Sequence, residues 1–179
     1  TAPLAADLDY VLAGKEEELQ AAVTALGKLT DGGVHVSVGK NGNSPLASLK
    51  GITLHKVSGP HPAGNVGAQI AKVDPINKGE TVWVVSPQDL VIIGELLLTG
   101  KFNAERTIAL AGSCVKNPQY YTTKIGAEVS TVVYDSGLKH NDVRVISGDV
   151  LTGLDVKPDG HLGYYHNMIS VIPEGDDYS

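Results

Sequence analysis

Cysteine and aromatic residues are scarce in this sequence. Cys114 is the only cysteine among 179 residues, so the chain cannot form an internal disulfide or build a metal site from several thiolates. We expect Cys114 to be a small buried hydrophobic residue rather than a reactive thiol. Aromatic residues make up only 5% of the chain, whereas hydrophobic residues make up 42%, so the predicted core is mostly aliphatic.

Positive charge and long apolar runs are also scarce. The 14 basic residues are scattered and outnumbered by 20 acidic ones, which argues against nucleic-acid binding and favours an acidic globular protein. There is no run of about 20 apolar residues, so we expect no membrane span, and any membrane role would be peripheral. The sequence starts at Thr1 without a visible secretory signal, and we interpret it as a piece of a longer protein.

Familiar catalytic and metal-binding motifs are missing. The nucleophile elbow Gly-x-Ser-x-Gly, the Walker loop and the dinucleotide spacing Gly-x-Gly-x-x-Gly do not occur. The six histidines include no i, i+4 pair on a predicted helix, so no metal site is predicted. His35 and His55 alternate with apolar residues, and we expect them on strands, facing solvent or partly buried.

Helical and strand patterns alternate in the first half of the chain. A helix is predicted over Lys15–Leu29, where apolar residues recur at helical spacing and the first turn is acidic. Strands are predicted over Val34–Val38 and Ile52–Val57, with one helical turn over Leu46–Leu49 between them. This order is typical of half of a parallel α/β layer, and it predicts a Rossmann-like α/β domain over residues 1–102.

The stretch Ser58–Gly67 is the most distinctive loop. It holds three glycines and two prolines in ten residues, which excludes the interior of a helix or central strand. It follows the carboxyl end of a predicted strand, where open α/β sheets bind ligands. His61 lies between two prolines, and two interpretations stay open: an imidazole held for a ligand or partner, or a turn-capping histidine. The candidate ligand or partner residues are Ser58, Gly59, His61, Gly64 and Asn65.

A strand and a well-marked helix follow that loop. Gly64–Lys72 predicts a short helix, and Thr81–Val85 predicts a compact apolar strand that carries Trp83, the only tryptophan. Ser86, Pro87 and Asp89 then form an N-cap, a first-turn proline and a capping box. The helix they begin is predicted to end at Gly100 and, being apolar all round, to be buried between layers or domains.

A second domain is predicted over residues 103–179, after a charged turn. Strands are expected over Arg106–Ala111 and Tyr120–Thr123 as a hairpin, then over Arg144–Ser147 and Met168–Ile172, with a glycine-rich loop over Gly148–Gly163. Ala127–Tyr134 fits a helix, but its β-branched residues also fit a strand. The cluster Tyr164–Asn167 fits an interface, and packing at the edge of the core is the favoured alternative. The order of elements is that of a β-grasp domain.

Several stretches together resemble the A-subunit of the sodium-translocating NADH:quinone reductase. They occur in the family's order and span most of Gly59 to Gly175, whereas residues 1–57 match more loosely. The stretches are Gly59–Gly67, Gln88-Asp89 with Ile93-Gly94 and Thr99-Gly100, Glu105-Arg106 with Ile108–Gly112, Val115–Pro118, Arg144–Gly148 and Tyr164–Asn167. The family's chain is longer, so this sequence corresponds to its central part.

The resemblance implies a function as well as a fold. The family combines a Rossmann-like domain with a β-grasp domain of the soluble ligand-binding type. Its complex passes electrons from NADH to ubiquinone and exports sodium, and the A-subunit is peripheral on the cytoplasmic side of the bacterial inner membrane. The flavins and the iron–sulfur centre are expected on other subunits, with quinone contact and subunit docking expected here. The alternatives are a β-grasp module that binds a small ligand without redox chemistry, and an Rnf-type electron-transfer subunit.

Overall fold

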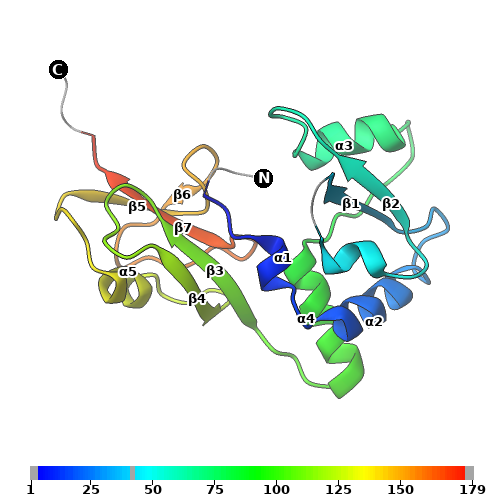
Figure 1. The fold of residues 1–179 in the computed structure, drawn as a ribbon, viewed down its shortest axis with the longest axis horizontal. Coiled ribbons are helices and arrows are strands. Elements are labelled where there is room, and N and C mark those ends of the chain that lie inside the picture. Colours follow the sequence, from blue (N-terminus) through cyan, green and yellow to red (C-terminus); the bar gives the residue numbers. More distant parts are fainter. Residues whose placement is uncertain (1–3, 41–42, 176–179) are drawn as a thin grey trace. The chain divides into compact units, whose positions relative to one another are not determined.

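The computed structural model describes residues 4–40 and 43–175 (Figure 1). These residues divide into two compact units, one of residues 7–103 and the other of residues 104–175 together with residues 4–6. Both units combine helices and strands, which confirms the predicted α/β class. The Rossmann-like and β-grasp assignments stay predictions.

The first unit contains a two-stranded parallel sheet and several helices. Its elements are α1 (Leu8–Val11), α2 (Glu16–Leu26), β1 (His35–Gly39), the 3-10 helix η1 (Pro45–Ser48), β2 (Thr53–Val57), α3 (Val66–Val73) and α4 (Pro87–Thr99). In the parallel ladder His35 lies opposite Thr53 and Gly39 lies opposite Val57. The predicted parallel pair is therefore confirmed. The four-residue α1 was not predicted, because one turn is too short to show a helical period.

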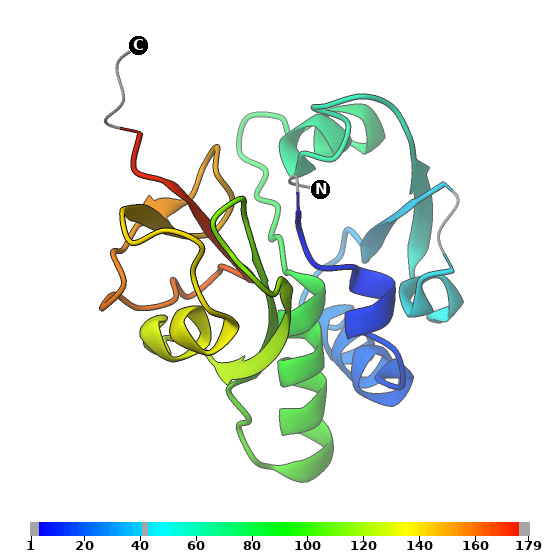
Figure 2. The same cartoon turned by 60° about the vertical axis from the view of Figure 1, so that its left-hand side comes forward.

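The core of this unit lies where α2 packs on α4 and on the sheet (Figures 1 and 2). Leu19, Ala22 and Val23 of α2 are buried there, and Val36 and Val38 of β1 join them. The two helices approach closely at Gly94. A Cβ placed on Gly94 would lie 1.8 Å from the backbone oxygen of Glu18, so this crossing requires a residue without a side chain.

The boundaries of α4 confirm the capping pattern. The Ser86 hydroxyl accepts a hydrogen bond from the Asp89 amide at 3.3 Å and donates to the Asp89 carboxylate at 2.7 Å. Gly100 ends the helix in the left-handed conformation. The prediction of burial on all sides is wrong for the last turn, where Leu96, Leu97 and Leu98 are exposed. The apolar residues of this turn therefore lie beyond the part of α4 that the core covers.

The predicted strand Thr81–Val85 is absent. The segment belongs to no helix or strand, and Val82, Trp83 and Val84 are exposed, Trp83 by 89%. Its composition is typical of a strand, but a strand also needs a neighbour that supplies hydrogen bonds. Among residues 7–40 and 43–103, the sheet consists of β1 and β2 alone. Local propensity therefore gave the wrong result here.

The second unit is built on one mixed sheet of five strands in the order β4-β3-β7-β5-β6. Its elements are β3 (Glu105–Ala111), β4 (Gln119–Lys124), α5 (Ser130–Ser136), β5 (Val143–Ser147), β6 (Leu154–Asp155) and β7 (Met168–Pro173). The β3–β4 hairpin is confirmed as antiparallel, and β7 lies between β3 and β5, parallel to β3. The open choice at Ala127–Tyr134 resolves as α5, and β6 lies within the stretch predicted as loop.

The core of this unit is aliphatic, as predicted. Ile108, Val133, Val145 and Val171 are completely buried, and Cys114 is buried among them as a small hydrophobic residue. At its rim the Tyr121 hydroxyl of β4 donates to the Asp135 carboxylate of α5 at 2.9 Å. Burial is the main reason that the pKa of Tyr121 lies above its ordinary value, and Asp135 acts in the same direction.

Candidate functional site

The loop that the sequence singled out connects β2 to α3. The Ala63 amide donates to the Pro60 carbonyl at 3.0 Å, and the Asn65 amide donates to the Pro62 carbonyl at 2.8 Å, so two turns close the loop. The side-chain amide of Gln69 on α3 donates to the carbonyls of Ala63 and Gly64. The backbone of the loop is thereby tied to the helix that follows it.

All five candidate residues of this loop are exposed: Ser58, Gly59, His61, Gly64 and Asn65. Gly59 has a φ of 137°, a conformation that favours glycine. Asn65 is the N-cap residue of α3, but its side chain makes no capping hydrogen bond. An exposed imidazole, amide and hydroxyl therefore lie along one loop. Such groups are suited to binding by hydrogen bonds, and the arrangement holds no nucleophile paired with a base.

An exposed apolar segment begins where this loop ends. We call residues 66–85, which are α3 and the irregular chain after it, the 66–85 arm. None of the eight residues of α3 is buried, although the helix carries Val66, Ile70 and Val73. Ile76, Val82, Trp83 and Val84 are also exposed. The sequence did not predict this surface, because the composition of Thr81–Val85 predicts a compact apolar strand.

Two buried polar side chains, Arg106 and Ser147, make hydrogen bonds to the cluster Tyr164–Asn167 and the residue before it. Arg106, only 2% exposed, donates from Nη1 to the carbonyls of Tyr164 at 2.9 Å and His166 at 3.4 Å. Ser147 Oγ accepts from the Gly163 amide and hydrogen bonds to His166 Nδ1 at 2.7 Å. Tyr164 and Tyr165 are 57% and 79% exposed, so the predicted packing at the core edge is wrong for both rings.

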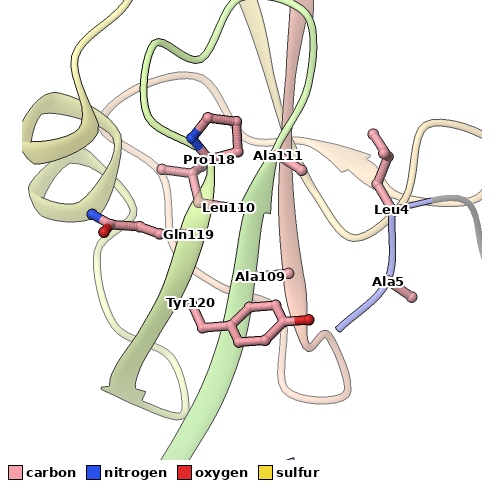
Figure 3. A pocket seen from close by; sticks show the side chains of 8 residues that line it. All are labelled: Leu4, Ala5, Ala109, Leu110, Ala111, Pro118, Gln119 and Tyr120. Atoms are coloured by element: carbon pink, nitrogen blue, oxygen red, sulfur yellow. The ribbon is translucent and has the colours of Figure 1, made fainter. Parts of the chain in front are cut away.

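A small apolar depression lies on the second unit (Figure 3). Its volume is about 320 Å³, and it lies between Leu4 and Ala5 on one side and β3 and β4 on the other. Ligand sites usually add a few convergent polar groups to an apolar lining. Here the Gln119 amide already donates to the Tyr121 hydroxyl, so little remains to orient a polar ligand.

Metal-ligating side chains do not form larger groups in the described ranges. Across residues 4–40 and 43–175, no three of His, Cys, Asp and Glu lie close enough together to hold a metal ion.

In the same ranges, no helix has both the length and the hydrophobicity that a bilayer crossing requires.

Comparison with known proteins agrees with the sequence resemblance. Residues 1–102 match the family model described as NqrA second alpha/beta domain, and residues 107–157 match the NQRA C-terminal domain. Curated relatives named as the A-subunit of the Na(+)-translocating NADH-quinone reductase are 40% identical over 176 residues in Neisseria meningitidis serogroup B and 39% identical over 180 residues in Rhodopirellula baltica. A relative of the same name from Serratia proteamaculans is 40% identical over 179 residues.

These matches cover 98% of this chain but only 39% of each relative. The chain therefore spans well under half the length of the curated relatives it matches. The family models match residues in both units, and the aligned relatives extend over 98% of the chain. The chain belongs to the NqrA family, the A-subunits of the Na(+)-translocating NADH-quinone reductase.

Proposed function

We propose that this chain is the central part of a peripheral subunit of a sodium-translocating NADH:quinone reductase, and that it acts by docking to other subunits. In this proposal the complex couples NADH oxidation and quinone reduction to sodium export at the bacterial inner membrane, with the chain on its cytoplasmic side. The names of the relatives support the complex. The observation that carries the docking role is the exposed 66–85 arm.

The arm exposes several large apolar side chains to solvent. Trp83 is 89% exposed, Val84 57% and Ile76 52%, and they lie within one short stretch of chain. Val82, Trp83 and Val84 are three consecutive exposed apolar residues. Contiguous exposed apolar residues mark interaction surfaces, and tryptophan is enriched among the residues that contribute most to binding. A partner that covers this arm would remove its apolar side chains from water.

We assign electron transfer and its cofactors to other parts of the complex. A single buried cysteine cannot ligate an iron–sulfur cluster, which needs several thiolates. The sequence also lacks the dinucleotide-binding glycine spacing. The flavins, the iron–sulfur centre and NADH then belong to the whole complex rather than to these residues.

We also propose that the loop Ser58–Gly67 contributes the polar contacts of this surface, to a partner or to quinone. Its His61 and Asn65 side chains are exposed, and the loop leads directly into α3. A quinone headgroup presents carbonyl oxygens, and the imidazole N–H and the amide N–H₂ are donors that match them. The loop and the arm would then form one continuous contact region within the first unit.

The docking proposal is tested through Trp83, the only tryptophan of the chain. The chain labelled with 5-fluorotryptophan gives one ¹⁹F signal, and adding the complex without its A-subunit should shift and broaden it. Trp83→Ser should weaken the binding by about tenfold or more, as expected for a buried tryptophan anchor. Tyr134→Ser, which changes an exposed aromatic residue of α5, is the matched control. Equal affinity of wild type and Trp83→Ser would contradict the docking role of the arm.

The quinone proposal has a separate test. A ubiquinone analogue should bind the chain saturably, and His61→Ala should abolish the binding while His140→Ala, another exposed histidine, leaves it unchanged. Binding that persists in His61→Ala would contradict a quinone contact at this loop. Docking measured through Trp83 does not depend on that outcome.

A further inference from the structure

We infer that His35 and His55 form a surface site for a divalent transition-metal ion, separate from the candidate loop and the arm. The two residues lie 20 positions apart in the sequence, one on β1 and one on β2. Nδ1 of His35 and Nε2 of His55 are 2.9 Å apart. The ring planes are within 5° of parallel and the ring centroids are 5.2 Å apart, so the two imidazoles lie side by side with these nitrogens adjacent.

The parallel ladder explains why the two rings meet. His35 is paired with Thr53 and Ser37 with His55, so all four side chains share one face of the sheet. The opposite face carries Val36 and Val38, which are buried in the core. The histidine face is open to solvent, since His35 is exposed and His55 is half-buried. A metal ion can therefore reach the pair without any unfolding of the sheet.

The geometry of the pair suits a chelate. One of the facing nitrogens donates its proton and the other offers its lone pair. When the donor ring moves its proton to its other nitrogen, two lone pairs face each other with no net proton release. Zn²⁺–imidazole bonds are about 2.0–2.1 Å long, so a tetrahedral ion requires the two nitrogens to separate by about half an ångström and each ring to tilt by about 35° towards the ion. Exposed side chains on a two-stranded sheet can move that far.

The ligand set defines the class of metal. Two imidazoles favour Cu²⁺, Ni²⁺ and Zn²⁺, whereas Mg²⁺ and Ca²⁺ prefer oxygen ligands. The strand residues on the same face add the hydroxyls of Ser37 and Thr53 but no carboxylate. Water completes the coordination, so the ion exchanges freely and stays open to an additional ligand. The affinities should follow the order in which Cu²⁺ binds more tightly than Ni²⁺ or Zn²⁺.

The first experiment follows the histidine resonances of the chain by NMR during a titration with Cu²⁺. At substoichiometric Cu²⁺, paramagnetic broadening should remove the signals of His35 and His55 before those of His61, His140 and His161. His35→Gln and His55→Gln should each abolish this preference, while His140→Gln should leave it unchanged. Equal broadening of all exposed histidines, or an unchanged preference in both pair variants, would overturn the proposal.

A second measurement uses stability and diamagnetic ions. Because an ion that binds only the folded state stabilises it, Zn²⁺ should raise the melting temperature of the wild type and not that of His35→Gln or His55→Gln. Mg²⁺ at the same concentration should have no effect. A rise of equal size in wild type and both variants, or with Mg²⁺ as with Zn²⁺, would show non-specific binding and overturn the site.

Discussion

The two units differ in the size of their sheets and in the burial of their helices. In the second unit the core lies between a five-stranded sheet and α5, and the buried hydroxyls of Ser136, Ser147 and Ser170 all make hydrogen bonds. In the first unit the sheet has two strands, no residue of α3 is buried, and the 66–85 arm exposes Trp83. Parallel sheets are normally covered on both faces, which supports our proposal that the first unit is the one that docks to other subunits.

The largest loss of stability is expected when the buried guanidinium of Arg106 in the second unit is removed. Arg106→Met removes the donors to the carbonyls of Tyr164 and His166 and leaves both carbonyls with fewer partners. Hydrogen bonds from charged groups contribute about 1.5–3 kcal/mol each, so the free energy of unfolding should fall by about 3 kcal/mol. Urea unfolding and amide hydrogen exchange of β3 and β7 measure this.

A control for Arg106 is Arg144, which forms a partly exposed ion pair with Glu174 at 2.6 Å. Exposed ion pairs contribute about 1 kcal/mol or less, so Arg144→Met should cost much less than Arg106→Met. If both variants lost a similar free energy of unfolding, the buried Arg106 guanidinium would not stabilise the second unit more than the exposed ion pair does.

The next largest loss of stability is expected at the close contact between α2 and α4 in the first unit. Gly94→Ala places a Cβ 1.8 Å from the Glu18 backbone oxygen, so α2 and α4 must move apart. Overpacking costs about 1–3 kcal/mol, and a clash with backbone atoms belongs at the upper end of this range. The better helix propensity of alanine returns up to about 1 kcal/mol, so a net loss of about 2 kcal/mol is expected. Gly67→Ala is the matched control, because no atom lies within 4 Å of a Cβ at Gly67 of α3.

Gly67→Ala should be neutral or slightly stabilising by thermal unfolding, whereas Gly94→Ala should be destabilising. If both glycines tolerated alanine equally, α2 and α4 would not cross in close contact at Gly94. The two variants therefore distinguish the tightly packed helix α4 from the exposed helix α3 of the same unit.

Local signals in the sequence predicted most elements and their boundaries. Ser86, Pro87 and Gly100 fixed both ends of α4, because capping and left-handed glycine depend on neighbouring residues only. The hairpin and the parallel pair followed from apolar alternation. The failure at Thr81–Val85 has the opposite cause: strand propensity is local, but the partner strand that it needs is not.

Contacts between distant residues were beyond sequence reasoning. Arg106 binds carbonyls 58 and 60 residues away, and the His35–His55 contact depends on the register of two strands. A single sequence shows neither. The candidate loop was identifiable from its glycines and prolines, whereas its contacts stay predictions because they depend on the molecule that binds there.

A smaller effect concerns pH and the second unit. The Asp149 carboxylate accepts from Thr152 Oγ1 at 2.6 Å and from the amides of Leu151 and Thr152, and the Thr152 hydroxyl is the main reason that the pKa of Asp149 lies below its ordinary value. A lowered pKa means that the ionised form stabilises the fold above about pH 4 and that this contribution is lost as the pH falls.

Asp149→Asn should therefore reduce the free energy of unfolding by about 1 kcal/mol near pH 7. The difference from wild type should shrink as the pH falls through the acid range, because the Asp149 carboxylate becomes protonated and neutral like the amide of the variant. Urea unfolding at several pH values measures the gap. A gap that stayed constant over this acid range would show that the carboxylate charge is not what stabilises this turn.

The smallest effect is expected in the 66–85 arm. Trp83→Ser should change the free energy of unfolding by no more than about 0.5 kcal/mol, because Trp83 is 89% exposed and Thr81–Val85 belongs to no sheet. Chemical unfolding followed by circular dichroism measures this without the tryptophan signal. A loss of about 2 kcal/mol or more would mean that the Trp83 side chain is buried in solution, in contrast to its exposure here. A negligible loss of stability, together with loss of binding to the other subunits, would mean that Trp83 serves the partner rather than the fold of its own unit.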